Sequence, residues 1–547
     1  MRCRASVGVV AVVGVIAASS LLVAGCRSSS SSAGGATRDT AYVVGAKIGV
    51  APPDGVKDGE WSLPARDYAS SRFSNLSQIT PDNARNLHVA WTFSTGVLRG
   101  HEGQPLVVDN TMYMITPYPN VAYAIDLTQP GFPLKWKYRP ENAQAAVGVA
   151  CCDVVNRGAT FADGRIVYNL LDGHTVAVDA ATGTELWRVK MADLDRGETI
   201  TMAPIVVKGK VIVGSSGGEM GVRGWIAALD LGSGKEVWRA YSVGPDADMK
   251  CCAKFKPFYP QDRGANLGVS TWPGDSWKVG GAAVWGWVSY DPALNLLYHG
   301  TSNPGPWNGN QRPGDNKWTA AIIARDADSG EMVWAFQPTP HDIWDYDAVN
   351  ENILVDLPFN GRTRKVLEHF DRNGFAYMID RATGEVLSAK PFVPMNWASG
   401  VDPKTGRPIL LPNAEPQVKP YLISPGSGGG HNWNPMSYSP LTGLVYIPMM
   451  EGYMVESVVE DDQFKFTLGR TTINQGYANE PELRKKLRQE AADREKGYLL
   501  AWDPAKNKEA FRIPYPHAGN GGTMTTAGNL LVEGTINKTF AIYRADN

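Results

Sequence analysis

An internal repeat constrains the fold of this chain more than any other feature of its sequence. In its clearest form an alanine is followed two residues later by aspartate, then by glycine, and ten residues after the alanine by tryptophan. Three copies keep this spacing and three looser copies follow the same order, starting at Ala177, Ala228 and Ala324, and near Ala124, Met378 and Ala501. The aspartate and glycine fit a tight hairpin turn, and β-branched runs such as 165–168 and 210–213 precede them. Each copy therefore predicts a strand, a turn and a second strand.

Repetition of such a unit predicts an all-β propeller. A single four-stranded sheet leaves one face unburied, whereas sheets arranged around an axis cover one another. The recurring tryptophan would then wedge between neighbouring sheets. The copies lack the 3.6-residue apolar period of helical repeats, and the charged stretch 480–496 is expected to form a helix inserted on a rim. The composition agrees with a globular chain, since 43% of the 547 residues are hydrophobic and 20% are charged.

The N-terminus carries the features of an export signal. Two arginines within the first four residues precede an apolar stretch, which Val23-Ala24-Gly25-Cys26 closes. This pattern resembles a bacterial lipoprotein signal with Cys26 as the lipidated residue; an ordinary export signal or a membrane helix is the alternative. Arg27 stands where aspartate would retain a lipoprotein at the inner membrane, so we expect a periplasmic protein anchored to the outer membrane.

Three segments follow from this interpretation. We expect a signal peptide at 1–25, a Ser/Gly-rich tether and N-terminal extension at 26–60, and the propeller domain at 61–547. The formal net charge of -2 gives no reason to expect nucleic-acid binding. The lipid would be the only attachment to a membrane, and the protein could form a homodimer.

Four cysteines beyond the leader form two adjacent pairs, Cys151-Cys152 and Cys251-Cys252. An exported chain enters an oxidising compartment, in which disulfides are permitted. For the second pair, two free thiols, a local bridge and a metal-free structural role all stay open. No Cys-x-x-Cys-His occurs, so no c-type haem is attached covalently and electrons would leave to a separate protein.

Several segments together resemble the PQQ-dependent methanol and ethanol dehydrogenases (PQQ is pyrroloquinoline quinone). They occur in that family's order over 61–535, and they are Arg99-Gly100-His101-Glu102-Gly103, Ala150-Cys151-Cys152-Asp153 with Asn156-Arg157-Gly158, Gly214-Ser215-Ser216-Gly217 with Glu219 and Gly221-Val222-Arg223-Gly224, Gly300-Thr301-Ser302-Asn303-Pro304, and Trp344-Asp345-Tyr346-Asp347. The resemblance implies an eight-bladed β-propeller of four-stranded antiparallel blades. The chain runs only to Asn547, so the last blade is incomplete, the termini close the ring in another way, or the sequence is truncated.

The resemblance also implies a quinone site. A Cys151-Cys152 disulfide would form a flat apolar platform against the cofactor, and Trp285 would cover the opposite face. Arg157 suits a bidentate contact with a cofactor carboxylate, and Arg372 would lie beside the reactive carbonyl. The full set of expected cofactor-binding residues is Glu102, Cys151, Cys152, Arg157, Thr201, Ser216, Gly217, Gly218, Trp285, Arg372 and Asn432.

The matching metal site contains hard oxygen ligands, Glu219, Asn303 and Asp345. Two residues beyond Asp345, where the calcium enzymes carry a small residue, this chain has Asp347. On an extended segment both carboxylates can face one ion, and the added charge suits a trivalent cation. The resemblance is therefore closest to the lanthanide-dependent branch, with Ca²⁺ as the alternative. His341 precedes this site, but the resemblance gives the general-base role to Asp345 and leaves His341 a structural or wall role.

The implied activity is oxidation of a primary alcohol, methanol-like or ethanol-like, to an aldehyde. Asp345 would take the hydroxyl proton and Arg372 would assist catalysis, while electrons would pass to a soluble c-type cytochrome. A non-catalytic outer-membrane lipoprotein scaffold fits the leader and the repeats equally well, but it needs neither the cysteine pair nor the carboxylates. A PQQ dehydrogenase acting on a polyol or a sugar is the second rival.

Overall fold

The computed structural model describes residues 47–48, 57–412, 414–415, 417–458, 469 and 480–547. The predicted signal peptide, Cys26 and most of the tether lie outside the described residues. Every described element belongs to one compact unit, which lies within Val43–Asn547. Within the described part, no helix has both the length and the apolar character needed to cross a membrane.

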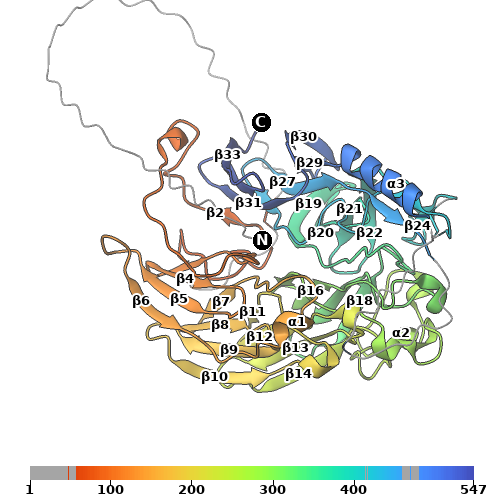
Figure 1. The fold of residues 1–547 in the computed structure, drawn as a ribbon, viewed down its shortest axis with the longest axis horizontal. Coiled ribbons are helices and arrows are strands. Elements are labelled where there is room, and N and C mark those ends of the chain that lie inside the picture. The colour runs from red at the N-terminus through yellow and green to blue at the C-terminus, as the bar shows by residue number, and fades with distance from the viewer. Residues whose placement is uncertain (1–46, 49–56, 413, 416, 459–468, 470–479) are drawn as a thin grey trace, which may run out of the picture. The chain divides into compact units, whose positions relative to one another are not determined.

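Strands dominate the described residues, and most belong to sheets of four strands that follow one another along the chain (Figure 1). The first three sheets are β3 (Leu106–Val108), β4 (Thr111–Ile115), β5 (Ala122–Asp126) and β6 (Leu134–Tyr138); β7 (Ala159–Ala162), β8 (Arg165–Asn169), β9 (His174–Asp179) and β10 (Glu185–Lys190); and β11 (Ile205–Val207), β12 (Lys210–Gly214), β13 (Trp225–Asp230) and β14 (Glu236–Tyr241). The β-branched runs at 165–168 and 210–213 thus form strands, as predicted.

Four further large sheets complete the series. They are β15 (Val288–Asp291), β16 (Leu296–Gly300), β17 (Ile322–Asp326) and β18 (Met332–Phe336); β1 (Lys47–Ile48), β19 (Asn352–Phe359), β20 (Arg362–Phe370), β21 (Phe375–Asp380) and β22 (Val386–Pro391); β26 (Ser437–Ser439), β27 (Leu444–Glu451), β29 (Lys496–Asp503) and β30 (Lys508–Tyr515); and β2 (Phe73–Ser74), β31 (Asn520–Thr526), β32 (Leu530–Thr535) and β33 (Phe540–Arg544).

The remaining elements are small. Two-stranded sheets pair β23 (Ala398–Val401) with β24 (Pro408–Leu410) and β25 (Tyr421–Ile423) with β28 (Met454–Glu456), the helices are α1 (Ala146–Val149), α2 (Leu267–Ser270) and α3 (Pro481–Arg494), and the 3₁₀ turns are 84–86, 194–196, 218–220, 260–262, 276–279 and 309–311. The helix α3 confirms the insertion predicted within 480–496.

The structure confirms an all-β propeller but corrects its number of blades, because the described residues form seven sheets of four or more strands rather than eight. Each of the six repeat copies supplies the turn between the last two strands of one sheet. The seventh sheet carries no copy and takes β2 from the N-terminal part of the chain, parallel to β31. The expectation of eight came from the family resemblance and not from the repeats themselves.

A segment near the N-terminus joins several blades. Backbone carbonyls of residues 68–72 accept hydrogen bonds from one strand in each of four different sheets: Tyr290 N–H to Tyr68 at 3.0 Å, Leu354 to Ala69 at 3.0 Å, Tyr438 to Ser71 at 2.8 Å and Thr525 to Arg72 at 3.1 Å. Buried apolar clusters fill the spaces between neighbouring sheets, including sheets two to four, four and five, and five and six. The core is therefore a series of layers between blades.

The repeat tryptophans explain how the blades dock. Each lies opposite the alanine of its own copy, and each ring packs on the turn glycine of the following sheet: Trp136 on Gly183, Trp187 on Gly234, Trp238 on Gly330 and Trp334 on Gly384. An added Cβ at these glycines would come within 2.5–2.9 Å of the ring. The predicted packing of tryptophan between sheets is thus a contact between a tryptophan ring and the turn of the next sheet, and only glycine fits at that turn position.

Replacing Gly330 with alanine is therefore expected to lower the free energy of unfolding by about 2–4 kcal/mol, from the left-handed backbone and the overpacked ring together. Gly330 has φ +73° and its added Cβ would lie 2.5 Å from Trp238. Gly361→Ala is the matched control, because Gly361 has φ +78° with no atom within 4 Å. Thermal unfolding should shift clearly more for Gly330→Ala; equal shifts would contradict the docking role of the ring.

Candidate active site

The candidate site lies at one end of the blades because of how the strands alternate. In an antiparallel meander, the segment before the first strand and the loop between the second and third strands reach the same end of the sheet. All sequence-predicted site residues fall in such segments, drawn from the first six sheets. Residues far apart in the sequence therefore meet around a single cavity of about 270 Å³.

The cavity collects nearly the whole predicted set. Its lining includes thirteen of those residues: Glu102, Cys151, Cys152, Arg157, Thr201, Ser216, Gly217, Glu219, Trp285, Asp345, Asp347, Arg372 and Asn432. Two predicted residues, Gly218 and Asn303, do not line the cavity. They are neighbours, because an added Cβ on Gly218 would be 3.8 Å from Asn303 Oδ1. Residues that sequence reasoning missed are Ala150, Asp153, Val155, Thr199 and Trp433. Trp433 directly follows Asn432, and that adjacency was its only signal.

Both cysteine pairs are bridged. The Cys151–Cys152 disulfide, with its Cα atoms 3.8 Å apart, lines the cavity as the resemblance implied. Cys251 and Cys252 also form a local disulfide, which settles the choice left open for that pair. Its sulfur atoms lie near a carboxylate oxygen of Asp246, on the long loop between β14 and β15.

Arg157 organises one side of the cavity. Its guanidinium forms an ion pair with Glu102 at 2.7 Å and donates to Thr201 Oγ1 at 2.9 Å. It also lies over the Trp285 ring, with the guanidinium carbon 4.6 Å from the ring centroid. Burial raises the pKa of Glu102, and the charge of Arg157 opposes that rise. This corner offers a buried cation for an anionic, planar ligand.

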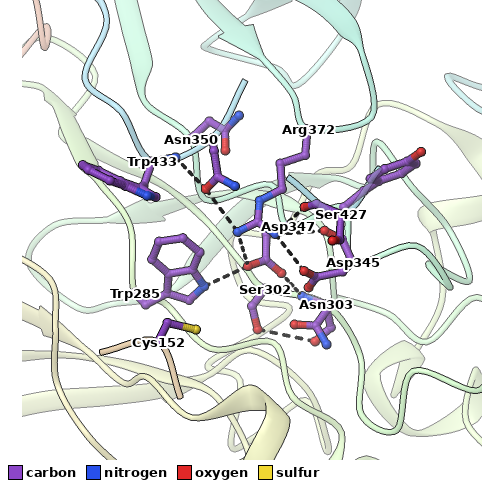
Figure 2. A network of polar contacts seen from close by, with 12 residues as sticks. Cys152, Trp285, Ser302, Asn303, Asp345, Asp347, Asn350, Arg372, Ser427 and Trp433 are labelled. Atoms are coloured by element: carbon purple, nitrogen blue, oxygen red, sulfur yellow. Dashed lines mark hydrogen bonds and ion pairs between the residues drawn. The ribbon is translucent and has the colours of Figure 1, made fainter. Parts of the chain in front are cut away.

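A second part of the lining contains carboxylates around Arg372 (Figure 2). The Arg372 guanidinium lies 3.0 Å from Asp345 Oδ2 and 3.3 Å from Asp347 Oδ2, and it donates to Asn432 Oδ1 at 3.2 Å. The Trp285 indole N–H donates to Asp347 Oδ2 at 2.9 Å, and the Asn303 backbone N–H donates to Asp347 Oδ1. Asp347 is therefore joined to both the aromatic wall and the cluster.

Negative charge exceeds positive charge within this cluster. Burial, and then the Asp347 carboxylate, raise the pKa of Glu219 to about 7. Burial also raises the pKa of Asp345 well above its ordinary value, and the charge of Arg372 only partly opposes the shift. Three carboxylates thus interact with one guanidinium, and this excess of negative charge favours either protonation of a carboxyl group or the binding of another cation.

The oxygen atoms in the cluster suit that cation. Asn303 Oδ1 and Asp345 Oδ1 are buried and have no hydrogen-bond partner among the described residues. With Glu219 and Asp347 they form an all-oxygen donor set, which is the preference of hard metal ions. Asp347 uses three of roughly four acceptor positions on its carboxylate, so capacity for a metal remains. The residues present therefore fit a hard metal ion.

His341 takes no part in the cavity lining. Its Nδ1 lies 2.8 Å from the Gly314 carbonyl oxygen, and burial lowers its pKa.

Gly217 in the cavity wall is a position that requires glycine. It has φ +108°, and a Cβ there would lie 2.3 Å from the Gly197 carbonyl oxygen. Only glycine fits this close approach of the backbone.

Comparisons with known proteins give the family. Residues 61–395 match the family described as PQQ: glucose/ethanol/alcohol dehydrogenase, β-propeller domain. The lanthanide-dependent methanol dehydrogenase of Methylacidiphilum fumariolicum is 47% identical over 488 residues, covering 88% of this chain and 78% of that protein. Methanol dehydrogenase (cytochrome c) subunit 1 of Methylorubrum extorquens is 41% identical, with 88% of this chain and 77% of that protein covered.

A solved structure agrees with these relatives. The europium-containing methanol dehydrogenase superimposes with a TM-score of 0.84 at 45% identity, and the match covers 89% of this chain and 84% of that one. The family match, the sequence identity and the fold therefore all indicate the same family. The chain belongs to the PQQ-dependent dehydrogenases, a family of quinoprotein alcohol-oxidising enzymes.

Proposed function

We propose that this protein is a periplasmic alcohol dehydrogenase that oxidises a primary alcohol to an aldehyde with PQQ and a lanthanide ion. One observation carries the proposal: three carboxylates converge around a single arginine in a cavity that the Cys151–Cys152 disulfide and Trp285 also line. A planar cofactor needs such walls, and a trivalent ion needs such charge. The relatives named for lanthanide and europium support the choice of metal.

The cofactor would lie among groups of matching chemistry. The disulfide and Trp285 would contact its plane, Arg157 would bind a carboxylate, and Thr201, Ser216, Glu102, Arg372 and Asn432 would complete its polar contacts. Glu219, Asn303, Asp345 and Asp347 would bind the metal. When bound, PQQ would accept the hydride of the alcohol. The cation would act as a Lewis acid that polarises the PQQ carbonyl.

Asp345 is the proposed general base. Its carboxylate would accept the proton of the substrate hydroxyl group, while the carbinol carbon loses its hydride. Arg372 contacts both Asp345 Oδ2 and the Asp345 backbone carbonyl at 2.9–3.0 Å, so it fixes the carboxylate within the cavity.

The partner and location extend the same proposal. The relative named as a cytochrome c-linked subunit supports a soluble c-type cytochrome as electron acceptor. Lipidation at Cys26, anchoring to the outer membrane and a homodimer stay predictions. The scaffold alternative is not favoured, because it explains neither the cavity nor its excess of carboxylates. The oxidation assay described next tests the alternative of a polyol or sugar substrate.

A dye-linked oxidation assay tests this proposal. The purified protein would be reconstituted with PQQ and either La³⁺ or Ca²⁺, then given methanol, ethanol, longer primary alcohols, a polyol and glucose. We expect the highest kcat/KM for a small primary alcohol with La³⁺, and no turnover without PQQ. Full activity with Ca²⁺ and none with La³⁺ would contradict the metal assignment, and preference for glucose would contradict the substrate class.

A further inference from the structure

The segment that carries the proposed base has an unusual backbone. Asp345 has φ +66°, in the left-handed region that residues other than glycine rarely adopt. Such a conformation costs on the order of 1–3 kcal/mol and persists only where neighbouring contacts enforce it. The contacts that enforce it here therefore determine where the carboxylate points.

Asp342 supplies those contacts from three residues upstream. Its Oδ1 accepts the backbone N–H of Trp344 and its Oδ2 accepts that of Tyr346, both at 3.0 Å. The two donors flank Asp345 on either side. Asp342 is 1% exposed and does not line the cavity, so it touches neither the proposed substrate nor the cofactor.

A buried arginine connects Asp342 to the segment that follows Asn303, another of the proposed metal ligands. Arg312 is fully buried and donates to the backbone carbonyl of Asp342. The same guanidinium donates to Asn316 Oδ1 at 2.8 Å and to the Trp307 carbonyl at 3.0 Å. The loop that contains Arg312 follows Asn303, so Arg312 ties the segment after Asn303 to the segment that carries Asp345 and Asp347.

We propose that Asp342 is a positioning residue for the metal site: it holds the 343–347 segment so that Asp345 and Asp347 face Asn303. This inference rests on the proposed function, because it assigns a role relative to that metal. Without the carboxylate, two backbone N–H groups lose their acceptor and the left-handed turn loses the contacts that enforce it. Metal affinity and turnover then fall together, whereas substrate binding depends on other walls of the cavity.

The test compares Asp342→Asn with Asp291→Asn. Asp291 is also buried; its Oδ1 accepts from Ala293 N–H at 2.8 Å and Leu294 N–H at 3.1 Å, and its Oδ2 pairs with Arg381 at 2.7 Å. It lies at the end of β15, at the opposite end of the sheet from the site, so its loss should destabilise the fold at least as much. An asparagine amide can replace only one of the two acceptor oxygens.

Titration with Tb³⁺, followed by tryptophan-sensitised luminescence, gives metal affinity independently of activity. For Asp342→Asn we expect a Kd at least tenfold higher and a kcat at least tenfold lower, with KM within threefold. Asp291→Asn should lower the unfolding temperature while leaving Kd and kcat within twofold. Asp342→Ser, whose hydroxyl oxygen still accepts one N–H, gives the same comparison if asparagine prevents folding.

Two failures can be told apart. A wild-type protein that binds Tb³⁺ together with an Asp342→Asn variant of unchanged Kd and kcat overturns the positioning role alone. A wild-type protein that binds no Tb³⁺ overturns the proposed lanthanide site, and this inference with it.

Discussion

Replacing Asp345 with asparagine is expected to lower kcat by about three orders of magnitude, the range lost when a general base is removed. The amide keeps the shape of the side chain but accepts no proton at neutral pH. Arg372 would still donate to the amide oxygen and to the backbone carbonyl at position 345. Cofactor binding should therefore persist, since its other contacts are unchanged.

The measurement pairs steady-state kinetics with the absorbance spectrum of bound PQQ. Asp153→Asn is the control, because Asp153 also lines the cavity but its carboxylate faces Arg99 at 3.1 Å. That variant should keep most of its turnover. Wild-type kcat in Asp345→Asn would refute the base assignment, and loss of bound PQQ would show that the residue acts in binding instead.

Removing the carboxylate of Asp347 is expected to change the metal preference. With Glu219 and Asp345 alone, the site would carry one negative charge fewer, which suits a divalent ion better than a trivalent one. We expect Asp347→Ala to weaken La³⁺ affinity at least 100-fold, which is about 3 kcal/mol. Calcium affinity should fall much less, so the ratio of La³⁺- to Ca²⁺-dependent activity drops sharply.

A second substitution separates charge from packing. Asp347→Asn keeps the size of the side chain and one acceptor oxygen, so it can still accept from either the Trp285 indole N–H or the Asn303 backbone N–H, but it removes the negative charge. Metal titrations of the two variants should then give similar losses for La³⁺. If Asp347→Asn bound La³⁺ as tightly as the wild type, the charge argument for a trivalent ion would fail.

The sequence predicted the site better than the architecture around it. Repeat spacing located the turns, the docking tryptophans and most strands, because these depend on local contacts such as Ala177 opposite Trp187. Motif order assigned residues to the cavity correctly because their segments reach one end of the sheets. Two features had no local signal: the pairing of β2 with β31, and the left-handed backbone of Asp345, which depends on Asp342 and Arg312.

The prediction of eight blades was wrong for a related reason. The repeats themselves indicated six units, and the expectation of eight was taken over from the resemblance. The seventh sheet lacks the Asp-Gly turn and the tryptophan, so periodicity could not find it. Trp433 was missed because no repeat position or motif contact pointed to it, although it lies next to Asn432 in the lining.

The parallel pairing of β2 with β31 sets the order in which the molecule can be completed. Phe73 pairs with Thr525 and Ser74 with Thr526, so the last sheet needs residues from both ends of the domain. Closing a loop of about 450 residues costs roughly 5 kcal/mol of chain entropy in a flexible-chain estimate. The other large sheets can form from shorter stretches of the chain, but this sheet needs nearly the whole domain. Deletions near residue 73 and near residue 525 should therefore damage the same structural unit, although they lie at opposite ends of the polypeptide.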